Sequence, residues 1–147
     1  MKNNPRTIIN VLFKYILESF NECKKEILLK YNGELPTPKL NSVNDFLTLT
    51  FNLGRQRGHT TLIKTYAQPG DLVICINLDQ VNSFEECGFQ AITIFKFFED
   101  FTFGELRLND ESTIWINDYS SFKSDIKGKL NDALSIIATE NTIVKLG

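Results

Sequence analysis

The run Leu72-Val73-Ile74-Cys75-Ile76 is apolar at every position and rich in β-branched side chains. A strand with one face in water alternates apolar and polar residues, so this unbroken run indicates a strand that is buried on both faces. Strands of this kind belong to parallel sheets that have helices packed on both sides. The run therefore predicts an α/β fold with the sheet in the interior.

The segments on either side of this run carry alternating strand and helix patterns. Strand patterns occupy residues 45–51, 91–95, 113–116 and 142–146, and helical spacing of apolar residues occupies 59–67 and 126–137. The aromatic-rich residues 95–103 fit either a strand or a helix. Strands that alternate with helices predict a three-layer, mainly parallel sheet with flanking helices.

A further helix is expected before this core, over residues 5–31. Pro5 suits a first helical turn, and an Asn-Gly pair follows the last turn. Two prolines then predict an extended connector to a core at about 45–147. The chain has no long Gly/Ser linker and no internal repeat, and 147 residues is a usual length for one domain. A single domain over residues 1–147 is therefore predicted.

The composition excludes several classes of protein. Apolar residues make up 42% of the chain and charged residues 23%, which argues against disorder, collagen and coiled coils. Sixteen Lys and Arg against eighteen Asp and Glu give a net charge of −2. A nucleic-acid partner is therefore not expected, because domains that bind nucleic acids usually carry a positive field.

The cysteines and the apolar runs bear on location. Three widely spaced cysteines and a single histidine give no zinc-binding spacing, so we expect reduced thiols at Cys23, Cys75 and Cys87, as in a cytoplasmic protein. No apolar run reaches the roughly 18–20 residues of a membrane span, and Lys14 interrupts the apolar stretch near the N-terminus. Neither a membrane partner nor a signal peptide is expected. The sequence leaves the oligomeric state open.

The loop between the first strand and the helix at 59–67 carries the candidate chemistry. Its glycines let the backbone approach an anion, and its two arginines suit phosphate oxygens. Unpaired N–H groups at a helix N-terminus also bind phosphate. We expect a nucleotide- or phosphate-binding site at Gly54, Arg55, Gln56, Arg57, Gly58, His59, Thr60 and Thr61. The alternative is an ordinary strand-to-helix turn whose arginines face water.

Residues 53–61, Leu-Gly-Arg-Gln-Arg-Gly-His-Thr-Thr, resemble the Walker A loop of P-loop NTPases, in particular the Arg-Gln-x-Gly-Lys-Thr form of phage terminase-type ATPases. Over residues 45–147, the order of loop, apolar strand and late apolar strand with an acidic end is similar to that of small P-loop-like proteins of tailed phages. The resemblance implies a nucleotide-binding phage protein in the host-cell cytoplasm, with Mg²⁺ and ATP or GTP as ligands. Thr60 then stands where a P-loop hydroxyl holds the metal.

The loop departs from the Walker A pattern at its most important position. His59 stands where a P-loop lysine reaches the β- and γ-phosphates. Histidine is shorter and mostly neutral at pH 7. Arg55 or Arg57 are the candidates to replace the charge, from a different geometry. The alternative is that His59 begins the helix without any chemical role.

The Walker B-like strand at 113–116 is altered as well, because it ends in Asn117-Asp118. Either Asn117 replaces the aspartate that faces Mg²⁺, or Asp118 serves that role one residue late. Asp118 is the candidate catalytic residue, and Thr60 and Asp118 are the candidate metal ligands. The alternative is an end-of-strand turn in which Asp118 caps the next element. No catalytic glutamate follows.

Both motifs lack residues that P-loop NTPases use for catalysis, so the sequence predicts a P-loop fold with weak or absent NTPase activity. Any residual activity would be that of an ATPase or GTPase. The alternative function is a non-catalytic protein-interaction module, a phage modulator of a host, defence or replication factor. Asn77 and Asp79 are expected to be turn residues rather than ligands. The aromatic side chains between residues 89 and 103 are expected to pack in the core, with an exposed protein-binding surface as the alternative.

Overall fold

The computed structural model describes residues 5–30, 48–52, 58–109, 112–138 and 141–147, with side chains from residue 8 to 29 in the first helix. In chain order the elements are α1 (Pro5–Lys30), β1 (Thr48–Phe51), α3 (His59–Tyr66), β2 (Leu72–Cys75), α4 (Leu78–Glu86), β3 (Gln90–Thr93), α5 (Ile94–Thr102), β4 (Thr113–Asn117), η2 (Tyr119–Ser121), α6 (Ser124–Ile137) and β5 (Thr142–Leu146).

The five strands form one sheet in the order β1-β5-β4-β2-β3, and every neighbouring pair is parallel. The α/β class, the flanking helices and the N-terminal helix are therefore confirmed. The sheet is parallel throughout the described strands, where the sequence predicted a mainly parallel one. All four residues of β2 are buried, as its unbroken apolar run indicated.

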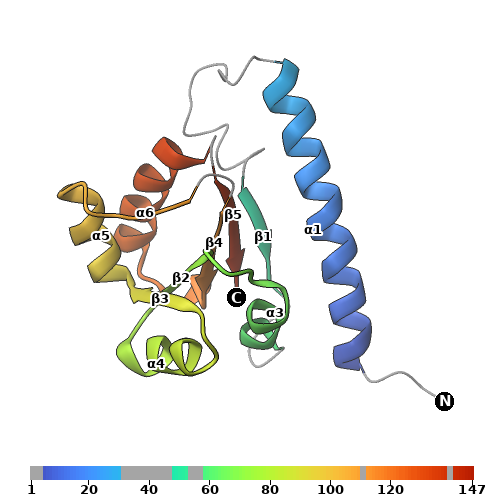
Figure 1. Cartoon of the computed structure of the whole chain (residues 1–147), viewed down its shortest axis with the longest axis horizontal. Helices are drawn as coiled ribbons and strands as arrows, with labels where there is room; N and C mark the ends of the chain where they lie inside the picture. Colours follow the sequence, from blue (N-terminus) through green and yellow to red (C-terminus); the bar gives the residue numbers. More distant parts are fainter. Residues whose placement is uncertain (1–4, 31–47, 53–57, 110–111, 139–140) are drawn as a thin grey trace.

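The two faces of the sheet are covered by different helices. The chain crosses the sheet outward from β1 through β2 to β3 and then returns through β4 to β5. Because connections between parallel strands are right-handed, helices of the outward and return legs lie on opposite faces. Figure 1 shows this arrangement, with α1 and α3 on one side of the sheet and α5 and α6 on the other. Side chains of α4 pack in the same cluster as those of α3.

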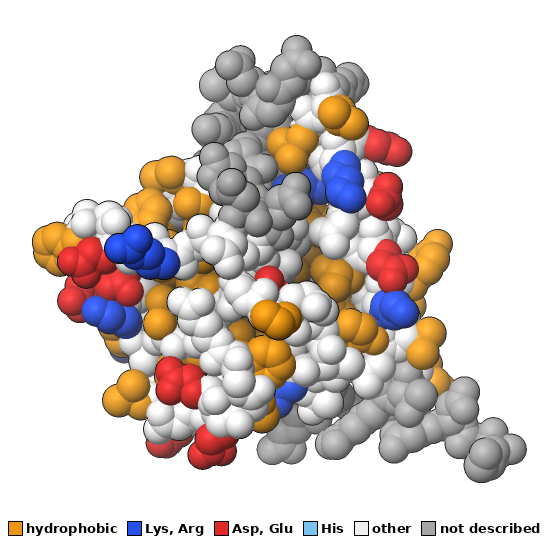
Figure 2. Space-filling model, viewed as in Figure 1, with side chains coloured by type: hydrophobic (Ala, Val, Ile, Leu, Met, Phe, Trp, Pro, Cys, Tyr) orange, Lys and Arg blue, Asp and Glu red, His pale blue; other side chains and the backbone are white. Residues whose placement is uncertain are grey.

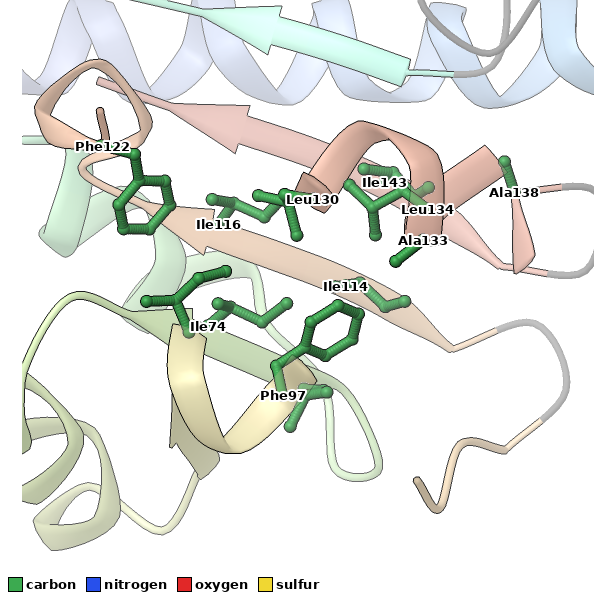
Figure 3. Packing of buried hydrophobic residues seen from close by; sticks show 12 residues of the cluster. Ile74, Phe97, Ile114, Ile116, Phe122, Leu130, Ala133, Leu134, Ala138 and Ile143 are labelled. Atoms are coloured by element: carbon green, nitrogen blue, oxygen red, sulfur yellow. The ribbon is translucent and has the colours of Figure 1, made fainter. Parts of the chain in front are cut away.

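Strand residues alternate between the two apolar clusters that result. On the return face, Ile74, Ile114 and Ile116 pack with Phe97 of α5 and Leu130 of α6 (Figure 3). On the outward face, the alternate strand residues pack with α3, α4 and α1 in a second cluster that includes Trp115 and Phe13. The ring centroids of these two side chains lie 6.2 Å apart. The long N-terminal helix is thus joined to the sheet by an aromatic contact.

Buried polar groups at the amino end of the sheet are satisfied by hydrogen bonds. The Asp71 carboxylate accepts from the backbone N–H of Gln68 (2.8 Å) and Thr113 (2.9 Å) and from Trp115 Nε1 (3.0 Å). These bonds join the start of β2 to the start of β4. They hold a buried charge in place and leave none of these donors without an acceptor.

A second buried group at this end ties α1 to the start of β5. Lys24 Nζ donates to the backbone oxygen of Asn141 at 2.6 Å, and the Asn141 amide donates to the carbonyls of Asn109 and Ser112. Burial lowers the pKa of Lys24 to about 8. A lysine in this position anchors the helix by a hydrogen bond that both its charged and its neutral form can donate.

Three interpretations of the sequence are corrected or resolved. Residues after β2 form the helix α4, which the sequence reading missed; Asn77 is its N-cap, since its side chain accepts from Gln80 N at 3.0 Å, and Asp79 lies in its first turn. The ambiguous residues 95–103 lie mainly in the helix α5, with Phe97 buried but Phe95 and Phe103 exposed. The three cysteines form no disulfide.

Candidate functional site

The carboxyl ends of β2 and β4 form a natural binding position in this sheet. These two strands are neighbours, but β2 leads into α4 on one face and β4 leads into α6 on the other. Where neighbouring strands send their connections to opposite faces, a crevice opens between the strand ends, and ligands of open α/β sheets bind there. The side chains in this crevice come from α3, α4 and the end of β4.

The start of α3 contacts the end of β4 directly. Gly58 is the N-cap of α3 and has φ of 86°, a conformation that glycine adopts without steric cost. Two residues on, Thr60 Oγ1 donates to Asn117 Oδ1 at 3.2 Å. The two motifs that the sequence analysis singled out are 57 residues apart in the chain and are joined by this hydrogen bond.

A cavity of about 300 Å³ lies beside this bond and is lined by Thr60, Asp79, Gln80, Ser83, Phe84 and Asn117. The lining residues come from α3, α4 and the end of β4, and five of the six carry a hydroxyl, amide or carboxylate group beside the Phe84 ring. Lys64 lies next to it, because its Nζ donates to Ser83 Oγ at 2.8 Å and sits 5.4 Å from the centre of the Phe84 ring. Residue types that can ligate a hydrated Mg²⁺, and a cation that suits an anion, therefore lie around this cavity.

Asp118 points to a different partner from Asn117. It has φ of 58°, the one positive value among the described residues other than glycine. Its Oδ2 accepts from Gln80 Nε2 at 3.0 Å, and Gln80 Oε1 accepts from Ile76 N at 3.1 Å. It precedes η2 without forming a side-chain cap. The residue bonded to Thr60 is therefore Asn117, while Gln80 ties the Asp118 carboxylate to the end of β2.

His59 is almost fully buried at the start of α3. Burial lowers its pKa from the usual value, and the nearby charge of Asp118 opposes this effect. Since an unperturbed histidine titrates near pH 6.5, His59 is mainly neutral at pH 7. It does not supply the positive charge that a lysine brings to this position, whereas Lys64, one helical turn beyond Thr60, carries such a charge close to the cavity.

The remaining residues of the candidate loop divide into two groups. Gly54, Arg55, Gln56 and Arg57 lie outside the described residues. Thr61 is exposed on α3, and its backbone oxygen accepts from Thr65 Oγ1. Of the eight residues that the sequence nominated, Thr60 lines the cavity, and Gly58 and His59 precede it at the start of α3.

The sequence analysis missed the contribution of α4. Gln80 and Ser83 line the cavity and hold Asp118 and Lys64, yet neither was nominated. A signal was present, because Asn77 followed three residues later by Gln80 is a typical start of a helix. Asp79 was taken as a turn residue and lies instead in a helical turn that faces the cavity.

A second polar cluster lies at the carboxyl end of the sheet, on the α6 face. Lys145 Nζ donates to Asn131 Oδ1 at 2.6 Å and lies 4.6 Å from the centre of the Tyr119 ring, which Lys127 approaches to 5.2 Å. Burial, with a smaller effect from Lys127, lowers the pKa of Lys145 to about 8. The aromatic ring and the amide oxygen stabilise this buried amine.

Among the described residues, no group of three or more His, Cys, Asp or Glu side chains could hold a metal ion. A magnesium ion at the cavity would be held as it often is in nucleotide sites, by few protein oxygens together with water and phosphates.

In the part of the chain that the structure describes, no helix has the length and apolar character needed to cross a membrane. Comparisons with protein families, curated proteins and solved structures give no match to this chain.

Proposed function

We propose that this chain is a P-loop-like nucleotide-binding protein that holds a phosphate group of ATP or GTP, with Mg²⁺, at the N-terminus of α3. The observation that carries the proposal is the hydrogen bond between Thr60 and Asn117 at the edge of the cavity. It joins a helix N-terminus, which attracts anions, to the crevice between oppositely connected strands. The resemblance of residues 53–61 to a Walker A loop points to the same ligand.

Positive charge for the phosphates comes from Lys64 in this proposal. Lys64 Nζ is held by Ser83 Oγ beside the cavity, whereas burial keeps His59 mainly neutral. An amide at position 117 is a weaker metal ligand than a carboxylate and cannot accept a proton from water. The proposal is therefore one of binding, with little or no hydrolysis.

The test is nucleotide binding to the purified chain, by thermal shift and calorimetry with ATP, GTP and ADP, each with Mg²⁺. A ligand at 100 times its Kd raises the free energy of unfolding by about 2.7 kcal/mol. We expect a clear shift that is lost in Lys64→Met and in Arg57→Ala, while Lys25→Met, which replaces an exposed lysine on α1, retains it. If the chain is fully folded and none of the nucleotides raises its unfolding temperature, the proposal is contradicted.

A second candidate is a non-catalytic interaction module on the same scaffold. The observation in its favour is that Phe95 and Phe103, at the two ends of α5, expose 65% and 71% of their surface. Exposed aromatic side chains are common at protein interfaces. This candidate predicts no nucleotide binding, and His59→Lys does not create it. Nucleotide binding by the unmodified chain counts against it.

A further inference from the structure

Two lysines approach one tyrosine on the α6 face of the sheet, at its carboxyl end. Lys145 is the fourth residue of β5, Lys127 is the fourth residue of α6, and Tyr119 begins η2. The two Nζ atoms lie 4.6 Å and 5.2 Å from the centre of the same Tyr119 ring. Two like charges are thus held beside one ring, although they repel each other.

One amide fixes the inner part of this group. Asn131 Oδ1 accepts from Lys145 Nζ at 2.6 Å, and Asn131 Nδ2 donates to the Tyr119 hydroxyl at 3.2 Å. The buried amine and the hydroxyl are therefore held in fixed positions. We call Tyr119, Lys127, Asn131 and Lys145 the basic cluster. Lys127 and Tyr119 are only partly buried, so solvent reaches the basic cluster through them.

The basic cluster has more hydrogen-bond donors than acceptors. Lys145 is 5% exposed, and an ammonium group has three N–H donors. Among the described residues, Asn131 supplies its one oxygen acceptor, so two donors of this buried charge have only the Tyr119 ring beside them. The Tyr119 hydroxyl accepts from Asn131, and its own proton has no acceptor in the described part of the chain. Such donors suit a ligand that carries several oxygens.

The charges of the basic cluster are not balanced by a carboxylate in the part of the chain that the structure describes. Lys127 and Lys145 form no ion pair with the described residues. The charged neighbour that affects the pKa of Lys145 is Lys127, which lowers it. Lys96 on α5 differs, since its Nζ lies 3.0 Å from an Asp100 oxygen; Figure 2 shows acidic and basic side chains next to one another over α5.

We propose that the basic cluster binds a phosphate group, either as inorganic phosphate or as a phosphate monoester. A phosphate monoester has three terminal oxygens and close to two negative charges at neutral pH, which match two ammonium groups and one hydroxyl. A carboxylate has one charge and would leave one lysine unbalanced. The basic cluster shares no residue with the cavity at Thr60, so this proposal does not depend on the proposed function.

Binding supplies acceptors where the basic cluster has donors. Phosphate oxygens accept from the ammonium groups of Lys127 and Lys145 and from the Tyr119 hydroxyl. Hydrogen bonds between charged groups are about twice as strong as those between neutral groups. The phosphate also screens the two lysines from each other. Binding is expected to weaken as salt is added, because ions screen the partly exposed charges.

The first experiment is an NMR titration of the full chain with inorganic phosphate, followed through the side-chain Cε–Hε signals of lysine. At about pH 7.5 Lys145, with a pKa of about 8, is mainly protonated, and phosphate monoesters are mainly dianions. We expect saturable shifts at Lys127 and Lys145 but not at Lys129. Lys129 is the matched control, because it lies on the same helix with its Nζ 5.3 Å from another ring, Phe98. Sodium chloride at equal ionic strength should leave all three signals unchanged.

The second experiment repeats the titration in variants. Lys127→Met, followed at Lys145, and Lys145→Met, followed at Lys127, should each weaken binding at least about tenfold. Tyr119→Phe keeps the ring and removes the hydroxyl, so it should weaken binding about threefold. Lys129→Met should have no effect. Lys64→Met, at the nucleotide cavity, should leave the shifts at Lys127 and Lys145 unchanged, which separates this proposal from the proposed function.

Four outcomes overturn the proposal. Phosphate produces no saturable shift at Lys127 and Lys145, or sodium chloride produces the same shifts. Either the shifts are lost in Lys64→Met, which places the phosphate at the other cavity, or the affinity is unchanged in Lys127→Met and Lys145→Met at unchanged circular dichroism. A final titration with methyl phosphate identifies the source of the group: tighter binding than inorganic phosphate supports a monoester, and weaker binding supports the free ion.

Discussion

The two ends of the sheet differ in what their polar side chains bind. At the amino end, Asp71 and Asn141 bond mainly to backbone groups of neighbouring loops and strands. At the carboxyl end, Thr60 bonds to Asn117 and Gln80 to Asp118, side chain to side chain, beside a cavity. A backbone partner is fixed by the fold, whereas a side chain can turn to a ligand. We therefore expect the amino end to contribute mainly to stability, whereas the proposed function places binding at the carboxyl end.

Asp71→Ala is the change with the largest expected effect on stability. It removes one acceptor that three donors share and leaves buried N–H groups unpaired, which costs about 4 kcal/mol. Chemical denaturation measures this loss. Asp79→Ala, at the carboxyl end, is the matched control and should change the free energy of unfolding by less than about 0.5 kcal/mol, because Asp79 is exposed. Equal losses in both variants would remove the contrast between the two ends.

Lys24 gives the amino end a distinctive pH dependence. Its pKa in the folded chain, about 8, is below the usual 10.5 of the unfolded chain. Between these values the unfolded chain binds more protons, so the Lys24 contribution to the free energy of unfolding rises with pH, by up to about 3 kcal/mol. Unfolding curves from pH 7 to pH 10.5 test this as a difference between wild type and Lys24→Met. Lys25→Met is the exposed control, and a constant wild-type minus Lys24→Met difference contradicts the prediction.

Gly58 and Gly128 allow the backbone of the carboxyl end to be compared with that of an ordinary helix. Neither has an atom within 4 Å of an added Cβ, but Gly58 has φ of 86° while Gly128 lies within α6. Gly58→Ala should therefore lower the free energy of unfolding by about 1 kcal/mol through strain alone. Gly128→Ala should raise it by about 1 kcal/mol. Changes of the same sign would show that the turn before α3 is not constrained.

Thr60→Val has the smallest expected effect on stability and a large one on binding. Thr60 is exposed, so losing its bond to Asn117 should cost less than about 1 kcal/mol. Under the proposed function, nucleotide affinity falls by at least about tenfold, the equivalent of 1.4 kcal/mol. Thr60→Ser keeps the hydroxyl and retains affinity in calorimetry, as does Thr61→Val. A marked loss of stability with unchanged affinity would make Thr60 a structural residue.

The class of fold was predictable because a strand that is buried on both faces of the sheet shows an unbroken apolar run in the local sequence. The apolar runs of β2 and β4, together with the helical spacing after Gly58, identify the elements from short stretches of sequence. The order of the strands was not predictable, since such runs look alike and carry no mark of their neighbours. The helix α4 was missed because its apolar positions, Leu78, Val81 and Phe84, are few and stand between polar residues.

The candidate site was predictable only in part. Thr60 and Asn117 each belong to a recognisable pattern, and the sequence left open whether Asn117 or Asp118 holds the position that faces Mg²⁺ in a Walker B strand. The hydrogen bond from Gln80 to Asp118 spans 38 residues, so no local sequence pattern predicts it. Lys64 looks like any surface lysine in the sequence; its place beside the cavity depends on the packing of α4 against α3. The ligand itself remains a prediction.

The position of β1 at the edge of the sheet has a consequence for how the molecule assembles. In the sheet its neighbour is β5 alone, and the register partners Thr48 and Ile143 are 95 positions apart in the chain. Pairing between such distant segments is slow, because the entropy of closing a long loop is lost before the stabilising contacts form. During synthesis, β1 cannot pair until residues 142–146 have been made. The strand that leads into the candidate phosphate loop is thus expected to be among the last parts of the sheet to form.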